Sequence, residues 1–171
     1  SRCMTLQFQP IDDELIRKKA SQIFPKSDED TLSTIVLLSQ GSFQRVLDFE
    51  EKSFRQIISQ LRPWFIELKE FHPLLSKSIE TLSKSREHAK KLLWYLLLIS
   101  RAAYTENHIS LNFAQKLFKD LIGVIPSYDN LIIFSEYILS ALENIERNYS
   151  VRMTVEDLSI KTRELFFSAY S

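Results

Sequence analysis

Apolar residues recur every three or four positions along most of the chain, which is the spacing of an α-helix with one buried face. The first segment follows acidic residues and ends before Pro25, and the second opens near Ser27 or Asp28, both favourable helix caps. Gly41 suits the left-handed residue that ends a helix, and Ser42 can cap the next helix directly. Residues 12–47 are therefore predicted to form a module of three short helices. Its first helix would bury Leu15, Ile16, Ala20 and Ile23.

The same helical period continues over the rest of the chain. The predicted segments are a helix around residues 57–68, kinked at Pro63, and further helices over 74–82, 89–104, 110–121, 127–145 and from 154 onward. Segment 89–104 is the most apolar, so we expect it to be the central helix. Ser110 and Ser127 are expected to cap the helices that they begin. Thr154, with Asp157 three residues later, matches a capping box at the start of the last helix.

Residues 4–8 differ from everything that follows, because they alternate between apolar and polar side chains. That pattern predicts a short β-strand, which Pro10 ends. A single strand has no partner in an otherwise helical chain. We therefore expect residues 1–10 to be the remnant of a larger sheet domain upstream.

Composition removes several classes of function. The two glycines, Gly41 and Gly123, cannot supply a glycine-rich phosphate-binding loop. The single cysteine, Cys3, excludes an internal disulfide and a cysteine-based zinc site, and it fits a cytoplasmic location. His72, His88 and His108 have no acidic or cysteine partner at metal-ligand spacing, so neither a metal nor a cofactor is expected.

Charge and hydropathy argue against binding to nucleic acid and to membranes. The 22 basic and 22 acidic residues cancel, which disfavours strong direct binding to nucleic acid. The longest apolar run, Leu92–Ile99, is much shorter than the roughly 20 residues that span a bilayer, so no membrane contact is expected. The 44% of hydrophobic residues is typical of a soluble globular chain with a sizeable core.

Two short motifs are more specific than amphipathic helices. One is the triplet Ser1-Arg2-Cys3 in front of the predicted strand, and the other is the helix start from Gly41 to Leu47. In this order and at this separation they resemble the clamp-loader branch of the AAA+ ATPases. There a Ser-Arg-Cys triplet closes the nucleotide-binding domain, and a glycine-serine helix start lies in the three-helix lid that follows.

A third stretch extends the resemblance to the C-terminal part of the chain. Residues 148–158 are similar to the last part of the collar domain in the delta-prime branch of bacterial clamp-loader subunits, and the apolar helix Leu96–Arg101 also resembles that collar. The resemblance implies an all-α chain with a strand remnant over residues 1–10, a three-helix lid over 11–52 and a collar of five or six helices over 53–171. Its collar-interface candidates are Arg101, Asn148, Arg152, Met153 and Glu156.

The resemblance also implies an assembly role. The collar would associate with other clamp-loader subunits, of the gamma/tau and delta types, in the DNA polymerase III holoenzyme. Through that complex it would act on the sliding clamp and primed DNA. The chain itself would be no enzyme, and its collar faces would associate by burying apolar surface.

The resemblance assigns ATP-related positions to Arg2, Gln44 and Arg45. It implies that Arg2 is an arginine finger offered to ATP in a neighbouring subunit, where a permanently charged guanidinium stabilises negative charge on the transferring phosphate. Gln44, with Arg45 beside it, stands where active relatives have an ATP-sensing arginine. Because Gln44 has no charge, the resemblance implies a non-hydrolysing subunit.

Two alternatives stay open. The chain could be the lid and C-terminal part of an ATP-hydrolysing subunit, of the gamma/tau or helicase type, or an unrelated helical interaction domain. The aromatic residues of segment 64–71 and the pair Trp94-Tyr95 fit a core, with exposure at a subunit interface as the sharper hypothesis. The sequence upstream of Ser1 would separate these alternatives.

Overall fold

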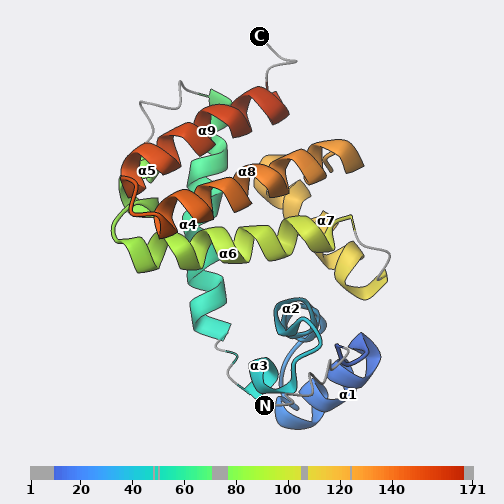
Figure 1. Cartoon of the computed structure of the whole chain (residues 1–171). Coiled ribbons are helices and arrows are strands. Elements are labelled where there is room, and N and C mark those ends of the chain that lie inside the picture. Colours follow the sequence, from blue (N-terminus) through green and yellow to red (C-terminus); the bar gives the residue numbers. More distant parts are fainter. Residues whose placement is uncertain are drawn as a thin grey trace, which may run out of the picture. The chain divides into compact units, whose positions relative to one another are not determined.

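The structure, a computed structural model, is entirely helical in the part of the chain that it describes. The described residues are 10–47, 49, 51–70, 77–104, 108–123 and 125–167, without the side chains of 51–54, 108–110 and 112. The all-α prediction is therefore confirmed, whereas the strand predicted over residues 4–8 lies outside the described residues. The chain divides into two compact units, Ser1–Phe49 and Glu50–Ser171 (Figure 1).

The described part of the first unit contains three helices, α1 (Asp13–Ile23), α2 (Glu29–Ser39) and α3 (Phe43–Leu47). Asp12 and Asp28 cap the first two: their carboxylates accept hydrogen bonds, both of 2.8 Å, from the backbone N–H groups of Glu14 and Thr31. The unit has its own core of Ile16, Ala20, Ile35, Val36 and Val46, with Phe24, Leu32 and Phe49 packed against it.

The predicted inner face of α1 is wrong at two positions. Leu15 is 57% exposed and Ile23 is 38% exposed, although both share the helical period. Ile16 and Ala20 occupy the centre of the buried stripe, one turn apart. Leu15 precedes Ile16 and is rotated by about 100° from it, so its side chain points toward solvent.

Gly41 allows the turn after α2 to pack closely against residues 10 and 11. Gln40 and Gly41 both have left-handed backbone conformations, with φ of 49° and 71°, and they end α2. The Gly41 carbonyl accepts a 3.0 Å hydrogen bond from the N–H of Ile11. A Cβ atom at position 41 would lie 2.5 Å from Cβ of Pro10 and 2.8 Å from both N and O of Ile11. Glycine is thus required here by conformation and by space.

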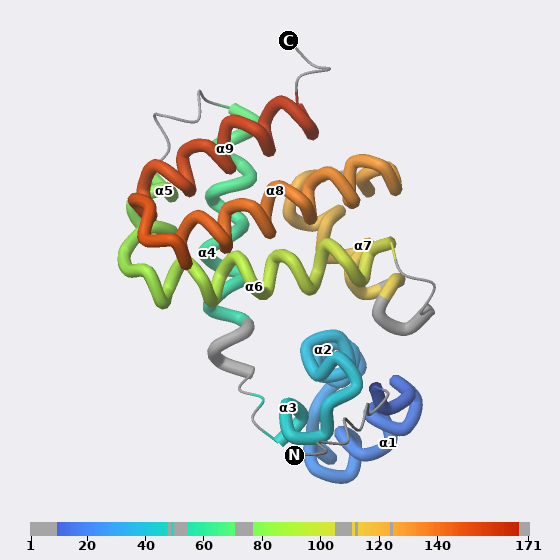
Figure 2. The backbone as a smooth tube through the Cα atoms, in the orientation of Figure 1, coloured from blue at the N-terminus to red at the C-terminus, as the bar shows by residue number. Residues whose placement is uncertain are grey.

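The second unit contains six helices in its described part. They are α4 (Glu51–Glu70), α5 (Ser78–Leu82), α6 (Arg86–Ala102), α7 (His108–Ile122), α8 (Tyr128–Glu146) and α9 (Val151–Phe167). The tube in Figure 2 shows the short α8–α9 connection, after which α9 runs back beside α8. Helix α4 continues as one helix through Pro63. None of the described helices is both long and apolar enough to cross a membrane.

The core of the second unit is aromatic. Trp64, Phe65, Phe118 and Phe134 are its largest fully buried side chains. Phe134 has its ring centroid 6.3 Å from those of Phe65 and Phe118, and 5.0 Å from that of Phe166. The buried Trp64 donates a 2.9 Å hydrogen bond from Nε1 to Oγ of Ser159 on α9, so its polar atom is satisfied. These contacts tie α4, α7, α8 and α9 together.

Helix α6 is central, as expected for the most apolar segment. It contacts α4, α5, α7 and α8. It begins earlier than predicted, because the Ser85 side chain caps it by accepting a 3.2 Å hydrogen bond from the N–H of His88. Ser127 caps α8 as predicted, since its side chain accepts from the N–H of Asn130 at 3.3 Å. Helix α7 already begins at His108, ahead of the predicted cap at Ser110.

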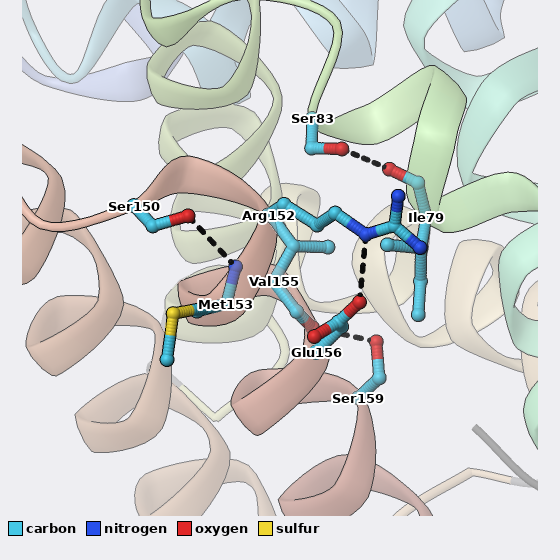
Figure 3. Close-up of polar contacts among 8 residues, drawn as sticks. All are labelled: Ile79, Ser83, Ser150, Arg152, Met153, Val155, Glu156 and Ser159. Carbon is cyan, nitrogen blue, oxygen red and sulfur yellow. Dashed lines mark hydrogen bonds and ion pairs between the residues drawn. The ribbon is translucent and has the colours of Figure 1, made fainter. Parts of the chain in front are cut away.

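The predicted capping box at Thr154 is wrong. Helix α9 starts at Val151, and Oγ of Ser150 accepts a 3.4 Å hydrogen bond from the N–H of Met153 (Figure 3). Thr154 lies one turn inside the helix, where its hydroxyl donates a 2.9 Å hydrogen bond to the carbonyl of Ser150. Serine and threonine both favour caps, and the hydrogen-bonded turn at Asn148 and Tyr149, which ends α8, places Ser150 at the start of α9.

Replacing Gly41 with alanine is expected to destabilise the first unit by about 2 kcal/mol or more, because the new Cβ would clash while the backbone keeps its left-handed conformation. Gly123→Ala is the matched control, since Gly123 has φ of 85° but nothing lies within 4 Å of its added Cβ. The control should cost only about 1 kcal/mol. Urea unfolding followed by circular dichroism measures both. An equal or smaller loss for Gly41→Ala would contradict the packing argument.

Candidate interaction surfaces

The residues of the predicted lid motif lie at the α2–α3 turn. Gly41 is buried against residues 10 and 11, and the N–H of Ser42 donates a 2.9 Å hydrogen bond to the carbonyl of Ser39. Gln44 and Arg45 are both exposed. Arg2, the predicted arginine finger, lies outside the described residues, so its role stays a prediction.

Arg45 has an intramolecular partner. Its Nη1 atom donates a 2.7 Å hydrogen bond to Oε1 of Gln40, the left-handed residue that ends α2. The contact places the guanidinium near the C-terminal end of α2, where a positive charge is favourable. The described geometry therefore gives Arg45 a local structural role.

Asn148 ends α8 through its backbone. It has a left-handed conformation with φ of 66°, its N–H donates to the carbonyl of Ile145 at 3.2 Å, and the N–H of Tyr149 donates to the carbonyl of Asn144 at 3.0 Å. This pair of hydrogen bonds is the Schellman motif, and asparagine is one of the few residues that tolerates its left-handed position. The left-handed conformation of Asn148 thus sets the direction in which the backbone leaves α8 and enters α9.

Three further collar candidates lie on the first turns of α9. Nε of Arg152 donates to Oε1 of Glu156 at 2.9 Å, and this hydrogen bond, with the charge of Glu156, raises the pKa of Arg152. Figure 3 shows this pair on the side of α9 that faces Ile79 of α5 and Ser83, the residue after α5, whereas Met153 points away from it. Met153 is 69% exposed. The α8–α9 corner therefore presents an ion pair on one side and an apolar side chain on another.

Arg101 is not part of this corner. It lies in the last turn of α6, and the adjacent Ser100 hydroxyl contacts the start of α8, 3.2 Å from the carbonyl of Leu131 and 2.7 Å from Oγ of Ser135. From Leu131 to Ile145 the helix rises by about 21 Å. The structure thus places Arg101 and the other four collar candidates at opposite ends of α8.

Arg86 holds the α8–α9 corner in place, and the sequence analysis missed it. From the start of α6, its Nη1 donates to the carbonyl of Ile145 and its Nη2 to that of Tyr149 at 3.5 Å. Ile145 lies in the last turn of α8, where a cation is favourable, and its carbonyl also accepts from the N–H of Asn148. Tyr149 lies in the α8–α9 connection. Because the predicted helix began at residue 89, Arg86 lay outside it, and no local pattern pointed to this contact.

An open groove runs between α6 and α8. It has a volume of about 590 Å³ and is lined by Glu87, Lys90, Lys91, Trp94, Leu139, Leu142, Glu143 and Glu146. Trp94 is 41% exposed, so the interface hypothesis for Trp94 fits better than the core hypothesis, whereas Trp64 and Phe65 are each 1% exposed and belong to the core. The charged positions on the walls were not singled out from the sequence, because solvated helix faces carry the same residues.

His88, in the first turn of α6, is the histidine whose side chain the structure describes. Its Nε2 atom is buried, with no hydrogen-bond partner in the described part of the chain. Burial lowers the pKa of His88 below its ordinary value, and the nearby charges of Lys84 and Lys91 lower it further. The folded chain therefore favours neutral His88.

Comparison with known proteins returns no relative: no protein-family model, no curated protein and no solved structure matches the chain. The described residues contain no group of three or more histidine, cysteine or acidic side chains placed to hold a metal ion. Interpretation of the chain's function therefore depends on its motifs and on the surfaces described above.

Arg86→Met is expected to destabilise the second unit by about 1–2 kcal/mol, because the carbonyls at the end of α8 would lose their cationic donor. The control is Arg147→Met, which removes an arginine at the same corner whose ion pair with Glu143, at 3.8 Å, is exposed. It should cost less than about 0.5 kcal/mol. Urea unfolding followed by tryptophan fluorescence reports on this unit, since both tryptophans, Trp64 and Trp94, belong to it. Equal losses for the two variants would refute the role of Arg86.

The lowered pKa of His88 predicts a loss of stability in acid. The unfolded chain takes up a proton near the ordinary pKa of about 6.5 and the folded chain only below it. The contribution of His88 is therefore complete above that value, and it falls as the pH drops from about 7 to 5. The unfolding free energy of the wild-type chain, measured across this range, should therefore fall relative to that of His88→Gln as the pH drops. A constant difference between the two would contradict the prediction.

Proposed function

We propose that the chain is the lid and collar part of a non-catalytic clamp-loader subunit of the delta-prime kind. It would assemble with sibling subunits of the DNA polymerase III holoenzyme, which place the sliding clamp on primed DNA during replication. The observation that carries the proposal is the position of the Gly41–Leu47 motif. It lies in a three-helix unit with its own core, and a separate helical unit follows.

The environment of the lid motif supports a subunit without ATP hydrolysis of its own. Gln44 is exposed and uncharged, so it cannot offer a cation to a phosphate. The neighbouring Arg45 donates to Gln40 within the same unit. In this proposal the lid acts as a rigid element, which the close contact of Gly41 with residues 10 and 11 helps to fix.

The surface of the second unit supports an assembly role. Large apolar side chains are exposed at both ends of α8: Ile125 and Tyr128 are 52% and 60% exposed near its start, and Tyr149 and Met153 are 59% and 69% exposed near its end. Aromatic residues and methionine are enriched in the centres of protein interfaces. A ring of related subunits requires two different contact surfaces on each member, which these two ends can supply.

Co-expression of the full-length protein with the gamma/tau-type and delta-type subunits of the same cell tests the proposal. We expect one stable complex that contains the protein in stoichiometric amount, seen by size-exclusion chromatography with light scattering. We also expect clamp loading on primed DNA to be lost when the protein is omitted. The control is the same mixture with a clamp-loader subunit of established delta-prime function. If that control assembles and this protein stays outside the complex, the proposal is wrong.

A further inference from the structure

The first turn of α6 contains a buried histidine nitrogen. Ser85 caps this turn, since its Oγ atom accepts a hydrogen bond from the N–H of His88 at 3.2 Å. The Nε2 atom of His88 is buried, and no group in the described part of the chain forms a hydrogen bond with it. In the protonated ring both nitrogens carry a hydrogen atom. The charged form would therefore hold a buried N–H donor without an acceptor, which costs free energy.

The charged groups near His88 also disfavour its protonated form. Burial lowers the pKa of His88, and the ammonium groups of Lys84, in the α5–α6 connection, and of Lys91, on α6, lower it further. Glu87 of α6 lines the groove toward α8. Carboxylates of the surrounding helices interact with other groups: Glu67 of α4 accepts from the N–H of Ser78, Glu80 of α5 and Glu156 of α9 act on Arg152, and Glu143 and Glu146 of α8 pair with Arg147 and Lys90.

The same turn of α6 carries the side chain that holds the α8–α9 corner. Arg86 donates from Nη1 to the carbonyl of Ile145, and from Nη2 to that of Tyr149 at 3.5 Å. Arg86 and His88 are two residues apart in the chain. Because helices open most easily at their ends, this turn can unwind while the rest of the unit stays folded. Unwinding would bring the His88 ring into water and withdraw Arg86 from both carbonyls.

We propose that the first turn of α6, residues 85–88, is an acid-sensitive switch: uptake of a proton by His88 opens the turn, and Arg86 then releases the α8–α9 corner. The opened turn is favoured in acid because its imidazolium is in contact with water. The released corner carries the side chains of Tyr149 and Met153, which are 59% and 69% exposed. Acid therefore changes the apolar surface that the corner presents. The inference concerns the fold of the second unit and does not depend on the proposed function.

Amide hydrogen exchange of the full-length protein, followed by mass spectrometry and corrected for the intrinsic effect of pH, tests the switch. The open turn binds a proton near the ordinary pKa of about 6.5, and the closed turn binds it only at lower pH. From about pH 7 to about pH 5.5 the opening equilibrium constant should therefore rise about two- to eightfold, the upper value applying if the closed turn takes up no proton. Peptides that cover residues 86–90 and 146–152 should lose protection by this factor. The peptide that covers residues 117–122 of α7 should not.

Three substitutions separate the switch from a general sensitivity to acid. His88→Gln removes the titrating group, so both peptides should keep their protection as the pH falls. Arg86→Met removes the contact with the corner, so residues 86–90 should still respond to acid while residues 146–152 should not. Lys84→Gln removes one of the two positive charges that lower the pKa of His88, so the acid response of both peptides should become smaller.

Several results would overturn the proposal. Equal acid responses of the wild-type protein and of His88→Gln would exclude His88 as the titrating group. An acid response of residues 146–152 that persists in Arg86→Met would exclude the connection to the corner. A matching loss of protection in residues 117–122 would mean that acid opens the whole unit and not this turn. If His88→Gln does not fold, an acid response that Lys84→Gln leaves unchanged refutes the switch.

Discussion

The antiparallel packing of α6 against α8 is the interaction on which the second unit depends. Its register is fixed at one end by the buried Ser100 hydroxyl, which contacts the carbonyl of Leu131 and the hydroxyl of Ser135, and at the other end by Arg86. The buried Ser100 hydroxyl favours one arrangement, because a slipped register would remove its contacts with Leu131 and Ser135. The same register brings Lys90 of α6 beside Glu146 of α8.

The α8–α9 corner depends on this register as well. Arg86 reaches the carbonyls at the end of α8 only when the start of α6 lies beside them. Asn148 then directs the chain into α9, whose Ser159 accepts the hydrogen bond from the buried Trp64. The surfaces that we propose for assembly are consequently outer faces of the packed helices α6, α8 and α9. The first unit depends on a separate constraint. Residues 10 and 11 pack against position 41 in the α2–α3 turn, and only glycine leaves room for them there.

Local patterns in the sequence predicted those features of the fold that depend on a few neighbouring residues, namely helices, caps and turns. The helical period, the cap at Ser127 and the left-handed turn at Gly41 were all accessible in this way, whereas the cap of α2 was narrowed only to Ser27 or Asp28, of which the structure shows Asp28. The cap of α9 was placed wrongly because Ser150 and Thr154 suit a cap equally, and only the preceding Schellman turn decides between them. Trp94 and Arg86 could not be placed, because tertiary packing determines which helix faces meet. For the same reason Arg101 was grouped with residues that lie at the other end of α8.

Our central claim is that the helical unit acts by docking against related subunits of a clamp loader. Photo-crosslinking in the native cell, with benzoylphenylalanine in place of Trp94, tests it most directly. The account predicts a dominant adduct with another clamp-loader subunit, identified by mass spectrometry, and a much weaker adduct when the crosslinker replaces the exposed Lys119 of α7. Adducts from position 94 that contain no clamp-loader subunit, while the protein is folded and abundant, would contradict the account.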